Sequence, residues 1–162
     1  MCQTLFHIKP VRTAADVQAT VQLFNAYASS IGVDLGYQDF ATELATLPGK
    51  YAAPTGELLL ARNSDGEPLG CVGLRPIAPD GCCEMKRLYV SPKARGLGLG
   101  KALVAAIIEE AVRIGYSEMR LDTLPTMSEA ISLYKRAGFL PIDPYYETPV
   151  AGTFFLARPL TG

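Results

Sequence analysis

The chain has 162 residues, a formal net charge of −1 and a hydrophobic content of 49%, which suits one packed core and predicts a single domain over residues 1–162. The near-zero charge disfavours a nucleic-acid partner, because binding to a phosphate backbone requires a basic excess. No apolar run approaches the length of a membrane span, and the N-terminus lacks the basic and apolar regions of a signal peptide. These features predict a cytoplasmic protein that does not enter a membrane.

The first third of the chain predicts one strand and two helices. A short strand at residues 5–8 stops at a proline, and Thr13 then has the character of a helix N-cap, with Asp16 as its capping-box partner. That helix ends at Gly32. A second, short helix is predicted from Tyr37 or Gln38 to Leu47, followed by a loop at residues 50–56.

The middle of the chain predicts an antiparallel meander. Two apolar runs, at residues 57–62 and 69–75, are separated by a turn-forming segment, and Asp80-Gly81 then turns into a third strand that begins at Cys83. Consecutive strands that are joined by such short turns pair antiparallel.

The last third alternates helices and strands. A helix is predicted from about Gly98 to Gly115, with Leu103, Ile107 and Val112 among its inward residues. The remaining predicted elements are a strand at 119–123, a helix at 127–137, and strands at 139–142 and 153–157.

The cysteines and the histidine do not predict a metal site. Cys2, Cys71, Cys82 and Cys83 form no C-x-x-C pair, and His7 is the single histidine, so a metal would lack a proper ligand set. Free buried thiols are the favoured interpretation. Cys83 as an acyl-carrying nucleophile is disfavoured because His7 lies in a distant strand.

A glycine-rich loop lies between the third strand of the meander and the next helix. Gly96, Gly98 and Gly100 alternate with leucines, so the backbone can approach an anion closely. The start of the helix adds free N–H groups, and Arg95 and Lys101 add positive charge. This combination predicts a site for a phosphate or a pyrophosphate.

Two common phosphate loops do not match this spacing. A Walker loop needs a glycine where Arg95 stands and a Ser or Thr where Ala102 follows Gly100-Lys101. A dinucleotide fingerprint needs a third glycine, which would fall at Lys101 or Leu103.

The loop resembles the (Q/R)-x-x-G-x-(G/A) motif of the GNAT superfamily of N-acetyltransferases, as Arg95-x-x-Gly98-x-Gly100. Residues 90–96 resemble the V-x-P-x-x-R-G run that precedes it in the family. Residues 130–139 resemble a second family motif, A-x-x-L-Y-x-x-x-G-F. The chain is more closely similar to bacterial GNAT proteins whose substrates are mostly unassigned.

The resemblance implies an α/β (α+β) GNAT fold. We expect a mixed, mostly antiparallel central sheet of about seven strands, splayed after the fourth strand and flanked by about four helices. The implied activity is transfer of an acetyl group from acetyl-CoA to a primary amine of a small molecule or peptide, without a metal. The alternative is a sensor or partner subunit that binds coenzyme A without efficient catalysis. A homodimer is also plausible for this family.

By resemblance, the loop amides hold the pyrophosphate of coenzyme A and the fourth strand pairs with the pantetheine arm. Arg136 either reaches the nucleotide end or is an ordinary cation at a helix end. The expected coenzyme A contacts are Leu88, Tyr89, Val90, Arg95, Gly96, Leu97, Gly98, Leu99, Gly100, Lys101 and Arg136.

Two residues are candidates for the chemistry. Tyr134 occupies the tyrosine position of the second motif, and its phenol could protonate the leaving thiolate, although a packing role is the alternative. Glu84 lies at the spacing of a glutamate base known in the histone-acetylating branch of the family. It could instead be solvated or paired with Lys86 or Arg87, and many family members use water as the base.

The acceptor pocket is expected in the variable loops of the family. Gln38, Tyr51, Tyr145 and Tyr146 lie in those segments, and ordinary packing is the alternative role for each.

Overall fold

The computed structural model describes residues 5–32 and 34–160. Within these ranges, seven strands form one sheet in the order β1-β2-β3-β4-β5-β7-β6. Every neighbouring pair is antiparallel except β4 and β5, which run parallel. The mostly antiparallel seven-stranded sheet that the sequence predicts is therefore confirmed. The strands are β1 (His7–Pro10), β2 (Glu57–Arg62), β3 (Pro68–Ile77), β4 (Cys82–Val90), β5 (Glu118–Thr123), β6 (Leu140–Pro141) and β7 (Phe154–Pro159).

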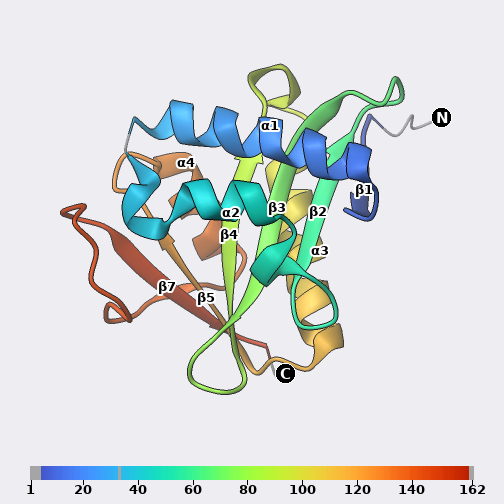
Figure 1. Cartoon of the computed structure of the whole chain (residues 1–162). Coiled ribbons are helices and arrows are strands. Elements are labelled where there is room, and N and C mark those ends of the chain that lie inside the picture. The colour runs from blue at the N-terminus through green and yellow to red at the C-terminus, as the bar shows by residue number, and fades with distance from the viewer. Residues whose placement is uncertain (1–4, 33, 161–162) are drawn as a thin grey trace.

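Four α-helices of the described residues cover the sheet on both faces. In Figure 1, α1 and α2 lie in front of the sheet, and α3 runs behind it. The helices are α1 (Ala14–Ile31), α2 (Phe40–Thr46), α3 (Leu99–Ile114) and α4 (Ser128–Arg136). Three short 3₁₀ turns accompany them: η1 (Leu35–Gln38), η2 (Gly49–Tyr51) and η3 (Pro92–Ala94). None of the helices within the described residues is both long and apolar enough to cross a bilayer.

The start of α1 is fixed by a side-chain cap. The Thr13 hydroxyl accepts from the Asp16 backbone N–H at 3.1 Å, and the Asp16 carboxylate accepts from the Thr13 N–H at 3.3 Å. This reciprocal pair satisfies two backbone donors that α1 would otherwise leave open. The predicted capping box is confirmed.

The second predicted helix is divided into two pieces. Asp39 adopts a left-handed conformation with φ of 57° and separates η1 from α2, so the continuous helix expected from Tyr37 or Gln38 is wrong. The loop expected after it starts with the turn η2. Gln38, at the end of η1, lines a pocket together with residues of β4 and β5.

Two apolar cores lie on opposite faces of the sheet. The larger one joins the sheet to α3 and α4 and includes Leu103, Ile107 and Phe139. The smaller one lies under α1 and includes Phe24 and Tyr51. The Tyr51 ring packs directly on Gly73, where a Cβ atom would come within 2.8 Å of the ring. Only glycine therefore lets this ring reach the sheet.

One inward residue of α3 was predicted wrongly. Val112 is 49% exposed, whereas Ala111 is fully buried. The buried stripe runs through Leu103, Ile107 and Ala111, which recur every four residues along one side of the helix. Val112 lies about 100° further round the helix and therefore faces solvent.

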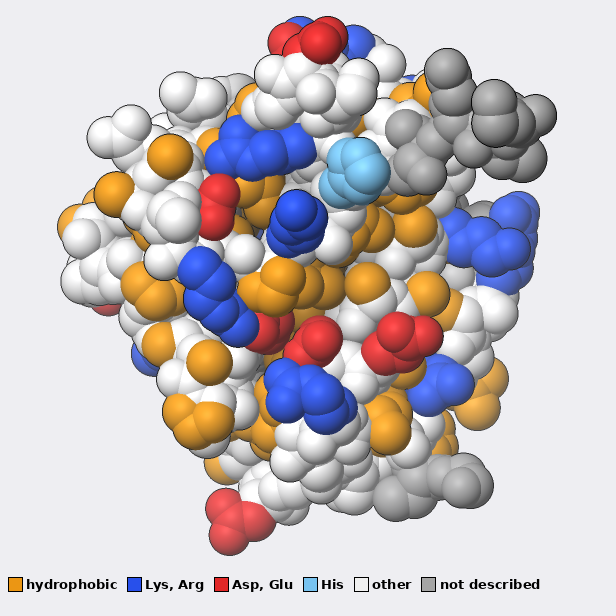
Figure 2. Space-filling view, turned by 90° about the vertical axis from the view of Figure 1, so that its right-hand side faces the viewer, with side chains coloured by type: hydrophobic (Ala, Val, Ile, Leu, Met, Phe, Trp, Pro, Cys, Tyr) orange, Lys and Arg blue, Asp and Glu red, His pale blue; other side chains and the backbone are white. Residues whose placement is uncertain are grey.

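The sheet surface beside β1 carries charges of both signs. Figure 2 shows basic and acidic side chains interspersed over this face, with apolar atoms between them. One such pair is Arg12 and Glu57, whose charged atoms are 2.8 Å apart. Opposite charges therefore neutralise each other locally on this face.

The sheet opens between β4 and β5. Their ladder contains three residue pairs, from Cys82 with Glu118 to Glu84 with Arg120. Beyond that point β5 leaves β4, as Figure 1 shows. The predicted splay after the fourth strand is confirmed, and it creates a wedge-shaped space in the middle of the sheet.

A bulge interrupts β4 at the same level. Lys86 pairs with Gly73 and Tyr89 pairs with Cys71, so two residues of β4 lie opposite one residue of β3. Arg87, inside the bulge, has a φ of 61°. An extra residue of this kind reverses the alternation of side chains between the two faces. Met85 and Leu88 consequently both pack on the core of α3.

Candidate active site

A groove with a volume of about 860 Å³ follows the opening between β4 and the start of α4. Its walls come from the end of β4, the glycine-rich loop, the first turn of α3, and α4. Nine of the eleven predicted coenzyme A contacts line it: Leu88, Tyr89, Val90, Arg95, Gly96, Gly98, Leu99, Gly100 and Arg136. The other two, Leu97 and Lys101, are exposed and do not line it.

The floor of the groove suits an anion. Gly98 is the N-cap of α3, with φ of 76° and no side-chain capping bond. The N–H groups of the first helical turn therefore have no side-chain acceptor at the cap, and the positive end of the helix dipole faces the groove. No atom outside the immediate chain lies within 4 Å of a Cβ built on Gly96 or Gly98. The loop thus leaves the room that a pyrophosphate requires.

A smaller inner pocket continues from this groove at the point where the strands separate. The two cavities share four wall residues: Tyr27, Ile31, Leu88 and Met127. The inner pocket is also lined by polar residues of β4, β5, η1 and α4: Gln38, Lys86, Arg87, Asp122, Thr123 and Tyr134. Its volume is about 30 Å³, which is room for about one water molecule.

Tyr134 lies at the wall of the inner pocket. It is 6% exposed, and its ring packs edge-on against Phe139 with the centroids 5.9 Å apart. Burial raises the pKa of the Tyr134 phenol well above its usual value, and the nearby Tyr27 and Asp122 raise it further. The hydroxyl therefore keeps its proton at neutral pH and can act as a hydrogen-bond donor.

Asp122 and Thr123 bring polar atoms to the pocket from opposite faces of β5, because successive strand residues alternate. The Asp122 carboxylate is held by Lys86 Nζ at 3.2 Å and by the Tyr146 hydroxyl at 2.5 Å. Burial pushes the pKa of Asp122 up, but Lys86 and Tyr146 outweigh that effect and the pKa is lowered. The Thr123 hydroxyl is buried and has no hydrogen-bond partner among the described residues.

Glu84 lies below the pocket, where β4 and β5 are still paired. Arg75 Nε donates to its Oε1 at 2.8 Å, and the Tyr145 hydroxyl donates to its Oε2 at 2.5 Å. Lys86 Nζ is 3.9 Å from Oε1, so it links the Glu84 and Asp122 carboxylates. Glu84 is 1% exposed and does not line the groove or the inner pocket.

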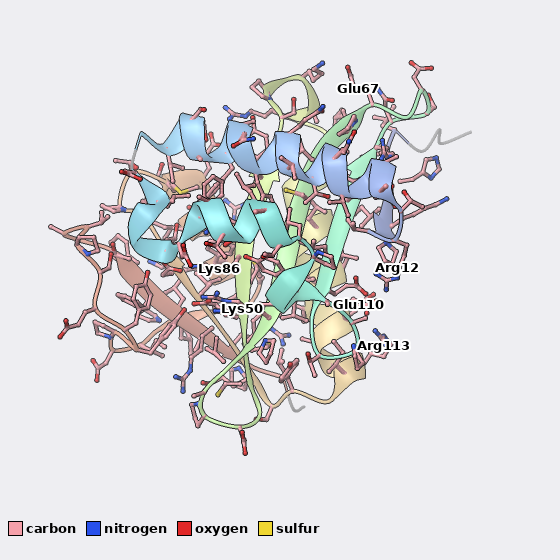
Figure 3. The ribbon with its side chains drawn as sticks, in the orientation of Figure 1. Arg12, Lys50, Glu67, Lys86, Glu110 and Arg113 are labelled. Carbon is pink, nitrogen blue, oxygen red and sulfur yellow. The ribbon has the colours of Figure 1, made fainter. Side chains whose placement is uncertain are left out.

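Arg87 forms a second buried ion pair on the same face. Its Nε and Nη2 donate to the two carboxylate oxygens of Glu43 at 2.9 and 3.0 Å. The guanidinium also lies over the rings of Phe40 and Tyr27, at 5.2 and 5.8 Å from their centroids. Figure 3 shows the neighbouring Lys86 beneath α2. The bulge therefore turns two consecutive cations, Lys86 and Arg87, toward the α1–α2 side.

The four residues predicted for the acceptor pocket are dispersed. Gln38 lines the inner pocket, and it also lines a small cavity under α2 together with Tyr51. Tyr51 is 2% exposed and belongs to the core under α1. Tyr145 and Tyr146 lie on the segment between β6 and β7, and their hydroxyls are bonded to carboxylates of the sheet.

The sequence analysis missed Asp122 and Glu43, and it named Lys86 and Arg87 only as possible partners of Glu84, a pairing that Lys86 makes at 3.9 Å. The acidic residue at 122 had a signal, because it stands in an alternating strand that leads directly into the second motif helix. The Arg87–Glu43 pair had no such signal, because the two residues are 44 positions apart in the sequence. The bulge that contains Arg87 also breaks the alternation from which the face of a strand residue is predicted.

The Cys83 thiol is buried beside the sheet. Burial raises the pKa of Cys83 to about 12, and the adjacent Cys82 and Glu84 contribute to the increase. A thiol with this pKa is almost entirely protonated near neutral pH and is a poor nucleophile.

Comparison with known proteins places this site in a family. The model of the acetyltransferase (GNAT) family matches residues 19–139. An uncharacterized N-acetyltransferase of Schizosaccharomyces pombe is 43% identical over 149 residues, which are 92% of this chain and 91% of that protein. The chain therefore belongs to the GNAT family of acetyltransferases.

Two further comparisons are with a curated relative and with a solved structure. An N-acetylaspartate synthetase of Danio rerio is 33% identical over 115 residues, which cover 70% of this chain and 41% of that protein. The crystal structure of a GNAT-family acetyltransferase from Staphylococcus aureus superimposes with a TM-score of 0.80 over 96% of this chain and 99% of that chain, at 19% identity. At this identity the likeness shows the fold, which is the GNAT fold.

Proposed function

We propose that this protein is an N-acetyltransferase that moves an acetyl group from acetyl-CoA to a primary amine of a small molecule or peptide. The observation that carries the proposal is the junction of two cavities, one suited to a pyrophosphate and the other lined by Asp122 and Tyr134. A relative named N-acetylaspartate synthetase supports a small amine as the acceptor.

The groove residues would bind the donor substrate. The loop amides from Gly96 to Gly100 and the Arg95 guanidinium would hold the pyrophosphate, and Arg136 lines the same groove on α4. The β5-facing backbone groups of β4 beyond Glu84 have no ladder partner within the described residues. The backbone around Leu88 to Val90 is therefore available to an extended donor chain, and an N–H there could stabilise the charge on the carbonyl oxygen.

Asp122 is the proposed acceptor of the amine proton, in place of Glu84. An ammonium group must lose a proton before its nitrogen can attack a thioester, because the protonated form has no lone pair. The neutral amine attacks, its nitrogen becomes strongly acidic as the C–N bond forms, and Asp122, which faces the pocket, can take that proton directly or through one water molecule. Glu84 does not take that role in our proposal because it lines neither the inner pocket nor the groove.

Tyr134 is proposed to stabilise the leaving sulfur. As the C–N bond forms and the C–S bond breaks, negative charge develops on the thiolate, whose usual pKa is about 8.5. The Tyr134 pKa lies well above that value, so full proton transfer from the phenol would be unfavourable. The phenol instead donates a hydrogen bond, and the proton that the thiolate finally takes is the one lost by the amine.

A direct test is to incubate the protein with acetyl-CoA and a panel of amines, and to follow release of the free thiol and formation of the amide. Turnover above hydrolysis with at least one amine is expected. Acetyl-CoA binding without turnover over a broad panel would favour the alternative, a sensor or partner subunit that binds coenzyme A.

Tyr134→Phe separates the role of the phenol from binding of the donor. We expect kcat to fall roughly 10- to 100-fold with little change in the Kd for acetyl-CoA, measured by calorimetry. Tyr116→Phe is the matched control, because its hydroxyl bonds the Thr55 carbonyl away from the groove. An unchanged kcat in Tyr134→Phe would remove Tyr134 from the mechanism.

A further inference from the structure

Two adjacent tyrosines on the segment between β6 and β7 make the same kind of contact. The Tyr145 hydroxyl donates to Glu84 and the Tyr146 hydroxyl donates to Asp122, each at 2.5 Å. Both rings pack edge-on against Phe155, with centroid distances of 5.3 Å. Tyr145 also lies under the Arg120 guanidinium, at 5.6 Å from the ring centroid, and each tyrosine holds a different carboxylate.

The two carboxylates have different surroundings. Asp122 lines the inner pocket, whereas Glu84 lines neither that pocket nor the groove. Glu84 retains the Arg75 guanidinium at 2.8 Å if the tyrosine bond is lost. Asp122 would keep Lys86, which it shares with Glu84 across 3.2 and 3.9 Å. A tyrosine bond should consequently matter more to Asp122 than to Glu84.

The charged and titratable groups around Asp122 come from three sides. Lys86 and Arg87 approach from β4, and both favour the ionised carboxylate. Tyr134 approaches from α4, and its phenol interacts unfavourably with the same charge when it ionises. Tyr145 and Tyr146 approach from the segment between β6 and β7.

We propose that Tyr146 is a positioning residue: its hydroxyl on Oδ2, together with Lys86 on Oδ1, fixes the plane of the ionised Asp122 carboxylate at the wall of the inner pocket. This inference rests on the proposed function, in which Asp122 receives the amine proton. Tyr145 makes the equivalent bond to Glu84 and serves the structure around Arg75 rather than the reacting groups.

The physical reason is that a hydrogen bond to a carboxylate favours its charged form. Without the Tyr146 hydroxyl, Oδ2 of Asp122 would lose its donor in a buried place, and the proton affinity of the carboxylate would rise. The carboxylate could also rotate about its terminal bond, because one of its oxygens, instead of both, would then be held by a partner. The rise in proton affinity is what a titration would detect, whereas the loss of a fixed carboxylate plane is what would slow proton removal from the acceptor amine.

The test compares Tyr146→Phe with Tyr145→Phe, since each variant keeps the ring against Phe155 and removes one hydroxyl. The side-chain carboxyl carbons of aspartate are labelled with ¹³C, the Asp122 signal is identified with Asp122→Asn, and its titration is followed by NMR. Tyr146→Phe should raise the titration midpoint of Asp122 by about one pH unit. Tyr145→Phe should move it far less.

Kinetics provide the second measurement. With an amine acceptor that is turned over, Tyr146→Phe should lower kcat roughly tenfold while the Kd for acetyl-CoA stays the same. An unchanged Asp122 midpoint in Tyr146→Phe, or an equal shift in Tyr145→Phe, would overturn the inference. The titration does not require turnover, so its failure is distinguishable from a failure of the proposed acetyl transfer.

Discussion

The proposed donor side and the proposed acceptor side of this molecule are built by different means. The groove proposed for the donor consists largely of backbone: a glycine loop, the open start of α3 and the free side of β4. The proposed acceptor side consists of buried ionic side chains drawn from α2, β3, β4, β5 and the segment before β7. A backbone site tolerates many side chains around it, whereas a side-chain network fails when one member is lost. Mutations should therefore have different effects on the two sides.

The largest expected effect is on the buried ion pair of the acceptor side. Glu43→Leu would leave the Arg87 guanidinium, whose side chain is 2% exposed, without a counter-charge. Loss of one partner of such a pair should lower the free energy of unfolding by about 3–5 kcal/mol, as measured by urea denaturation. A loss below about 1 kcal/mol would show that solvent or rearrangement compensates for the missing carboxylate.

Glu67→Leu is the control for this variant. Glu67 pairs with Lys93 at 2.8 Å, but the two side chains are 44% and 61% exposed. Exposed pairs contribute between about 0 and 1 kcal/mol, so this substitution should be nearly silent.

A glycine substitution tests the backbone site of the donor side. Gly98→Val should weaken acetyl-CoA binding about 100-fold, because a β-branched residue is strained at a φ of 76° and its side chain would occupy the space left for the ligand. Gly66→Val is matched, since Gly66 also has a positive φ, of 84°, and open space around it, but lies in the β2–β3 turn. Equal affinity losses in both variants would mean that strain alone, and not the site, explains the result.

The smallest expected effect is a pH-dependent one on the acceptor side. The folded pKa of Asp122 is below its ordinary value of 3.8, so its ionised carboxylate adds stability above that pH and loses it as the pH falls through the folded value. Asp122→Asn should cost about 2 kcal/mol at pH 7, and the difference from the wild type should shrink in acid. If the difference in the free energy of unfolding stays constant down to pH 2, folding does not lower the pKa of Asp122.

The same contrast explains what could be predicted from the sequence. The loop and the second motif are contiguous, and local spacing was sufficient to predict the groove and the position of Tyr134. The antiparallel meander and the ends of α1 also followed from local patterns, whereas the whole sheet and its splay were expected from the resemblance to the GNAT family. The acceptor side depends on contacts such as Arg87 with Glu43 and Tyr146 with Asp122, between residues far apart in the chain.

One wrong prediction and one revised candidate have specific physical causes. The helix predicted across Gln38 failed because Asp39 takes a left-handed conformation that an apolar pattern does not reveal. Glu84 was selected from a family spacing, which carries no information on its side-chain partners. The fully bonded environment of Glu84 and the pocket-facing position of Asp122 required the three-dimensional arrangement.

The bulge in β4 has a consequence for how this strand can change. Before Arg87, the odd-numbered residues Cys83 and Met85 face α3, and after it the even-numbered Leu88 and Val90 do. The strand is therefore two half-strands of opposite phase, joined at the bulge. Deleting Arg87 would repair the ladder with β3 and leave both half-strands on their present faces, but it would remove the guanidinium that holds Glu43 of α2. The irregularity thus adds a second cation to the α1–α2 side of β4 without changing which residues face α3.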